Sequence, residues 1–229
     1  MERVRTIKGK MPVILFAPHG YDGNDKNTSI IAETIAEDLN AYAVINLGWE
    51  RSNKVDDIAD LADCNNVYHC HEDIVKEEIL EPILRYVNQA KKNHNTVYMF
   101  NIHGMSNNHR SIENKKIDLV FGYGDGDPPS ITIDLWKKNF MMSKFIELGI
   151  DAYEGAPKGI FSGWSKSNMN QIFRKWYPDH FVQSAQIEIA YELRSDKIAA
   201  QMTADSIATT IESMLEMKVF STMEKFKVY

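Results

Sequence analysis

Short apolar runs alternate with longer stretches of helical periodicity along the chain. The apolar runs are rich in Val, Ile, Tyr and Phe, which is typical of buried strands, and they lie at residues 13–17, 42–47, 96–102, 117–122 and 183–190. Apolar residues at helical spacing lie at residues 28–39, 73–92, 132–148 and about 195–218. This alternation predicts an α/β fold of three layers, in which helices cover both faces of a mixed, mostly parallel sheet.

The first apolar run leads into a turn that carries three possible metal ligands. Residues 13–17 lie between two prolines, and the helix that follows has Thr28 or Ser29 as its expected N-cap. The turn between them contains His19, Asp22 and Asp25. Because open α/β sheets bind ligands outside the carboxyl ends of their strands, this turn is a candidate functional site.

Two later strands add polar residues that could belong to the same site. The run at 96–102 leads into His103-Gly104, which repeats the His19-Gly20 ending of the first run. The run at 183–190 contains Glu188 between apolar neighbours, and a buried carboxylate is costly unless it is paired or used. Histidines at the ends of neighbouring strands converge on one point. Because its strand is otherwise apolar, Glu188 is a candidate catalytic group, and a buried ion pair with Arg194 or with a lysine is the alternative.

These residue types suggest hydrolysis at a single zinc ion. Catalytic zinc sites use three protein ligands and leave a fourth position for water. His19, His103 and one of Asp22 or Asp25 supply such a set, which leaves Glu188 as general base for the water. Each residue also has an ordinary interpretation, because turn histidines and aspartates that cap helices are common.

Other polar residues suggest a contact with the substrate. Arg51 is a candidate for binding a substrate carboxylate through two hydrogen bonds, although it could instead pair with Glu50 or Asp56 on the surface. Lys158 and Arg110 are weaker candidates for the same contact.

A second group of thiols and imidazoles lies close together in the sequence, at Cys64, His69, Cys70 and His71. Thiolate and imidazole both bind zinc, but this spacing matches no common structural zinc pattern. We therefore favour the site built on the two His-Gly turns.

The order of the motifs resembles a known enzyme family. Pro18-His19-Gly20, an acidic residue shortly before a helix, His103-Gly104-Met105, and a Gln-Ile-Glu strand followed by Glu-Leu-Arg are similar to the N-formylglutamate amidohydrolase family. They also resemble phage-type poly-γ-glutamate hydrolases. Both groups share the fold of the zinc carboxypeptidases, which is a phosphorylase/hydrolase-like fold of the zinc exopeptidase type. The resemblance spans roughly residues 12–194.

The resemblance implies a role for each candidate residue. It assigns His19 and His103 as zinc ligands and Glu188 as the base. It leaves two choices for the remaining ligand. The His-x-x-Glu spacing of the carboxypeptidases matches Asp22, whereas the segment from Asp25 to residue 29 resembles the Glu-x-Gly-Thr-Ser of the polyglutamate hydrolases, and on this longer match we favour Asp25.

The resemblance also implies a substrate. Asn65 matches a family Asp-x-Asn-Arg loop, although this chain has Asn66 in place of the arginine, and Lys158 lies in a segment that matches a Pro-x-x-Gly loop. The implied activity is cleavage of an amide in a small acidic N-acyl amino acid, like N-formylglutamate. A metallopeptidase, a cell-wall or γ-glutamyl amidase, and a non-catalytic binding protein on the same fold are the alternatives.

Composition limits the remaining possibilities. A chain of 229 residues with 44% hydrophobic content can bury a full core, and we expect one domain over residues 1–229. A net charge of −6 without a basic block argues against nucleic acid and anionic membranes as partners. The N-terminus lacks the apolar core of a signal peptide, and no run approaches the roughly 18 apolar residues of a spanning helix. We therefore expect a cytoplasmic protein.

Overall fold

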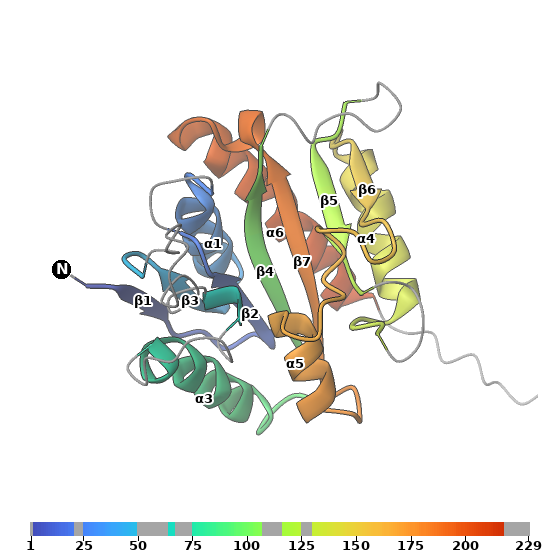
Figure 1. Ribbon diagram of the computed structural model, residues 1–229. Coiled ribbons are helices and arrows are strands. Elements are labelled where there is room, and N and C mark those ends of the chain that lie inside the picture. The colour runs from blue at the N-terminus through green and yellow to red at the C-terminus, as the bar shows by residue number, and fades with distance from the viewer. Residues whose placement is uncertain are drawn as a thin grey trace, which may run out of the picture.

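A seven-stranded mixed sheet forms the centre of the molecule (Figure 1). The computed structural model describes residues 2–20, 25–49, 64–66, 75–106, 116–124 and 130–217. The strands are β1 (Val4–Ile7), β2 (Val13–Ala17), β3 (Tyr42–Asn46), β4 (Val97–Met105), β5 (Leu119–Gly122), β6 (Ala152–Glu154) and β7 (Val182–Ala190). They lie in the order β1-β3-β2-β4-β7-β5-β6. The pairs β1/β3 and β5/β7 are antiparallel and the other four are parallel.

Helices cover both faces of this sheet. They are α1 (Thr28–Asp38), a π-helical turn η2 (Lys76–Leu80) that continues into α3 (Glu81–Ala90), α4 (Leu135–Glu147), α5 (Met169–Trp176) and α6 (Lys197–Glu216). Two short 3-10 helices, η1 (Cys64–Asn66) and η4 (Tyr191–Arg194), complete the described elements. Apolar residues of α1, α4 and α6 pack with one set of strand side chains, and those of α3 and α5 pack with the other set. In Figure 1, α6 lies behind β4 and β7.

This architecture confirms the predicted fold class, because the sheet is mostly parallel and lies between two helical layers. Strand β2 has the bounds predicted for it, and β3, β4 and β7 lie within a few residues of theirs. Strands β1 and β6 and helix α5 were not predicted. Strand β1 lies at the edge and is only partly buried, β6 has three residues, and α5 has eight residues and follows a segment with three glycines, Gly155, Gly159 and Gly163. Among the described residues, no helix combines the length and apolar character needed to cross a membrane.

The direction of the chain connections reverses at the carboxyl ends of β2 and β4. Strand β2 pairs in parallel with β3 on one side and with β4 on the other. The chain reaches β3 through α1 on one face and returns to β4 through α3 on the opposite face. Such a reversal separates the loops above the two strands and leaves space for a ligand. Both His-Gly motifs lie at this position.

The start of α1 differs from the prediction in one detail. Helix α1 begins at Thr28, but its N-cap is Asn27, which has a positive φ of 67°. The Thr28 hydroxyl donates instead to the carbonyl oxygen of Asp25 at 2.8 Å. Thr28 or Ser29 as N-cap was therefore wrong, and Thr28 stabilises the turn that contains Asp25.

One partly buried ion pair away from these strand ends allows a test of how α4 is attached to the sheet. Lys138 of α4 is buried, and its Nζ donates to Glu154 of β6 at 2.5 Å, while the Tyr123 hydroxyl donates to the other carboxylate oxygen at 2.8 Å. The Glu154 side chain is 46% exposed. We expect Glu154→Gln to lower the free energy of unfolding by roughly 1 to 2 kcal/mol at pH 7, because Lys138 loses its counter-ion but the pair is partly solvated.

The loss should depend on pH in a defined direction. Burial raises the pKa of Glu154, but hydrogen bonds from Lys138 and Tyr123 outweigh burial and hold the pKa below its ordinary value of 4.5. The pair therefore stabilises the fold above about pH 4.5, and this contribution disappears as the pH falls through the folded-state pKa. Glu147→Gln removes the exposed partner of Lys144 and should cost less than about 0.5 kcal/mol. Equal losses in the two variants, measured by urea denaturation, would contradict the prediction.

Candidate metal centre

His19 lies in the turn directly after β2, and neighbouring backbone holds this turn in place. The side-chain amide of Asn46, at the end of β3, donates to the carbonyl oxygen of Pro18 at 2.7 Å. A Cβ atom on Gly20 would lie 2.8 Å from the carbonyl oxygen of Asn46, which is closer than side chains pack. Glycine after His19 therefore allows the turn to lie against β3.

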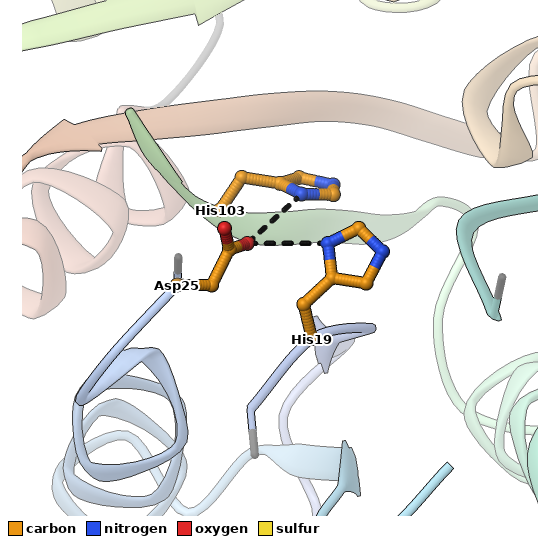
Figure 2. Close-up of side chains that lie close together, drawn as sticks. All are labelled: His19, Asp25 and His103. Carbon is orange, nitrogen blue, oxygen red and sulfur yellow. Dashed lines mark hydrogen bonds and ion pairs between the residues drawn. The ribbon is translucent and has the colours of Figure 1, made fainter. Parts of the chain in front are cut away.

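Asp25 reaches the same point from the N-terminal side of α1. Its carbonyl oxygen accepts hydrogen bonds from both the backbone nitrogen and the hydroxyl of Thr28, at 3.0 and 2.8 Å. Its side chain is buried and is directed toward the carboxyl ends of β2 and β4 (Figure 2). The local turn therefore fixes the backbone of Asp25 and so the direction in which its side chain leaves the turn.

His103 lies near the end of β4, where it is paired in register with Glu188 of β7. The imidazole of His103 is buried, and its ring centroid lies 5.2 Å from that of His19. His19 and Asp25 come from two turns and His103 comes from a strand. Figure 2 shows their side chains pointing toward one another.

The three side chains are spaced as ligands of one ion are spaced. The Oδ2 atom of Asp25 lies 3.2 Å from Nδ1 of His19 and 3.5 Å from Nδ1 of His103. One ligand atom from each residue lies within 4.8 Å of the others. Zinc binds such atoms at about 2.0 to 2.1 Å, which separates the ligand atoms of a tetrahedral site by roughly 3.4 Å. The donor set and its spacing therefore fit a zinc ion.

The charge of the cluster also suits a cation. Burial opposes ionisation of Asp25, but the hydrogen bonds from His103 and His19 outweigh this effect and hold the pKa of its carboxyl well below the usual range. Asp25 is therefore an anion. Within the described part of the chain, the buried Nε2 atom of His103 has no hydrogen-bond partner.

Glu188 lies beside the cluster in a different electrostatic state. Burial raises the pKa of Glu188 to about 7. The charge of His103 lowers this pKa, and the charge of Asp25 raises it. The amide of Gln186 donates to Oε1 of Glu188 at 3.0 Å. The amide of Asn168 in turn donates to Oε1 of Gln186 at 3.0 Å, and the same Asn168 caps α5. This chain of amides fixes the orientation of the carboxylate.

The structure separates the other predicted site residues into two groups. Asn65 lies in η1 next to Cys64, whose buried sulfur is 3.5 Å from the side-chain nitrogen of Asn46. Lys158 lies in an exposed turn with a φ of 58°, and within the described residues no hydrogen bond or ion pair of its side chain is found. The remaining candidates lie outside the described residues: Asp22, Arg51, Arg110, His69, Cys70 and His71.

Several residues that hold the site were not identified from the sequence. The sequence signal for Asn168 was present, because a helix cap followed by apolar residues at 169, 172 and 173 is typical of a helix N-terminus. Asn46 and Gln186 gave no such signal, since their partners are a carbonyl group and an amide on other segments. Arg194 was considered as the ion-pair partner of Glu188. In the structure its described hydrogen bonds go to backbone carbonyl groups instead.

Comparison with known proteins finds similarity in structure. No protein-family model and no curated protein matches the chain by sequence. The N-formylglutamate amidohydrolase from Ralstonia eutropha JMP134 is 12% identical, with 94% of this chain and 98% of that chain covered at a TM-score of 0.62. A bacteriophage poly-γ-glutamate hydrolase is 13% identical over 94% of this chain and 90% of that chain, with a TM-score of 0.58.

A metallo-carboxypeptidase from Burkholderia cenocepacia is also similar. It is 10% identical over 93% of this chain and 60% of that chain, with a TM-score of 0.52. At such low identity these comparisons establish the fold. The three proteins represent the three groups that the sequence motifs resemble, so the resemblance is confirmed as a shared architecture.

Proposed function

We propose that this chain is a zinc-dependent amidohydrolase that cleaves an amide bond in a small acidic N-acyl amino acid. The observation that carries the proposal is the convergence of His19, Asp25 and His103, with ligand-atom separations of 3.2 and 3.5 Å, beside the buried carboxyl of Glu188. The structural neighbours support a hydrolase, since all three are named as hydrolytic enzymes.

The residues divide the chemistry between them. His19, Asp25 and His103 would hold the zinc ion, which when bound would lower the pKa of a water molecule and polarise a substrate carbonyl group. Glu188 accepts the proton of the attacking water and delivers it to the leaving amine. Gln186 holds the Oε1 atom of Glu188, so we assign the proton transfer to Oε2.

The acidic substrate is proposed from the sequence and from the neighbours. Two of the neighbours are named for glutamate-containing compounds, N-formylglutamate and poly-γ-glutamate. Arg51 would bind the substrate carboxylate through two hydrogen bonds, and Asn65 and Lys158 would contribute further polar contacts.

Metal analysis and a substrate panel test the proposal. We expect one zinc ion per chain and an anomalous peak between the imidazoles of His19 and His103. We also expect faster hydrolysis of N-formyl-L-glutamate than of N-formyl-L-leucine, with γ-glutamyl dipeptides and C-terminal peptide substrates measured in parallel. Preference for the peptides would replace the proposed substrate with a peptidase substrate, whereas absence of stoichiometric zinc would refute the metal site itself.

A further inference from the structure

We propose that Arg194 is a positioning residue that holds together the segments that carry Asp25, His103 and Glu188. This inference rests on the proposed metal function. Arg194 lies at the end of η4, after β7, and its side chain has no solvent exposure. It is the largest of the fully buried side chains in the described residues, and it carries a charge.

The guanidinium group bonds to one carbonyl group in each of the segments that carry Asp25, His103 and Glu188. Its Nε atom donates to Ile189 at 3.0 Å, its Nη1 atom to Lys26 at 2.9 Å, and its Nη2 atom to Met105 at 3.1 Å. Ile189 follows Glu188 directly. In the same way, Lys26 follows Asp25, and Met105 lies two residues after His103. One planar group therefore sets the relative positions of the base and two ligands.

The backbone of Arg194 strengthens the connection to the turn before α1. The side-chain amide of Asn27 donates to the carbonyl oxygen of Arg194 at 2.7 Å. Asn27 has a φ of 67°, a left-handed conformation that asparagine tolerates better than most residues. The turn that carries Asp25 is thus bonded to Arg194 at both Lys26 and Asn27.

The glycine that follows His103 is explained by the same side chain. A Cβ atom on Gly104 would lie 2.3 Å from Cζ of Arg194 and 2.4 Å from its Nη2 atom, so no other residue fits without moving the guanidinium. In the His-Gly motif of β4, the histidine is therefore the proposed ligand, and the glycine leaves room for the guanidinium group of Arg194. This assigns a function to Gly104 that its sequence neighbourhood alone did not reveal.

Lysine cannot replace this group, because three bonds to carbonyl groups on different segments require the rigid planar fork of a guanidinium. Burial lowers the pKa of Arg194, while the negative charges of Asp25 and Glu188 raise it. The two site carboxylates therefore favour the charged form that makes these bonds. An arginine with a purely structural role would affect the stability of the whole fold and leave the affinity for zinc unchanged in the folded protein.

Zinc affinity of folded variants tests the proposal. We expect Arg194→Lys and Gly104→Ala to keep a wild-type circular dichroism spectrum and to bind zinc about 10- to 100-fold more weakly by isothermal titration calorimetry, the range found for residues that orient metal ligands. Arg194→Ala should regain part of its affinity when millimolar guanidinium is added. The matched control is Arg174→Lys, whose side chain also donates to backbone carbonyls but lies in α5, and it should bind zinc like the wild type.

The outcomes separate this proposal from the function on which it rests. A wild type that binds no zinc would refute the proposed function, and the positioning role with it. If the wild type binds zinc and the folded Arg194→Lys and Gly104→Ala variants bind it equally tightly, the positioning role alone is overturned. If both variants lose the fold, Arg194 serves the fold as a whole, and the positioning role is again overturned.

Discussion

Glu188→Gln is expected to reduce the kcat for hydrolysis of N-formyl-L-glutamate by about 10²- to 10⁴-fold, the usual contribution of a general base. Glutamine has nearly the same shape but cannot accept the proton of the attacking water. The zinc ligands are not changed, so the variant should still bind one zinc ion. Steady-state kinetics on samples of measured zinc content provide the test.

The control for this variant is Glu212→Gln, which removes an exposed carboxylate on α6. It should leave both kcat and zinc content unchanged. Loss of zinc together with activity in Glu188→Gln would show that Glu188 is a ligand rather than the base. Full activity in Glu188→Gln would remove this residue from the mechanism.

His103→Ala is expected to lower zinc affinity by more than roughly 100-fold. Residues that only hydrogen-bond to metal ligands contribute roughly 10- to 100-fold, and His103→Ala removes a ligand atom itself. The remaining pair of His19 and Asp25 leaves the ion with two protein ligands, one fewer than catalytic zinc sites commonly have. Activity should fall to the background rate at zinc concentrations that saturate the wild type. Calorimetric titration and kinetics at fixed free zinc measure both effects.

His94→Ala is the matched control, because His94 lies before β4 and its ring nitrogen contacts the backbone oxygen of Lys10. Its removal should leave zinc affinity unchanged. Removing His103 also replaces a buried side chain, so urea denaturation should accompany the titration. A His103→Ala protein that is folded and binds zinc as tightly as the wild type would exclude the proposed site.

Local sequence patterns determined those parts of the fold whose residues are buried on both sides. Strand β2 is a run of five apolar residues, all buried, and its bounds were predicted without error. Strand β1 has the residues Val-Arg-Thr-Ile at the sheet edge, where partial exposure leaves a weak pattern. Helix α5 is short, and the glycines before it obscured its apolar spacing. Edge and short elements depend on tertiary contacts that a local pattern does not report.

The candidate site could be predicted only where a side chain itself carries the chemistry. His19, His103 and Glu188 are polar residues at or near the ends of apolar strands, and this contrast is visible in the sequence. The turn that brings Asp25 to them depends on Thr28 and on a positive φ at Asn27, neither of which the sequence pattern specifies. The role of Arg194 could not be predicted, because its described partners are carbonyl groups that every residue has.

The bonds of Arg194 also determine when the site can form during synthesis. The ribosome makes the segments with His19 and His103 well before it makes β7 and η4. Contacts between such distant segments form only after the intervening chain has closed its loops. A nascent chain that ends before residue 194 has His19, Asp25 and His103 but lacks the guanidinium group that bonds to the segments of Asp25 and His103. If the chain binds zinc as proposed, we therefore expect tight binding only after η4 has left the exit tunnel.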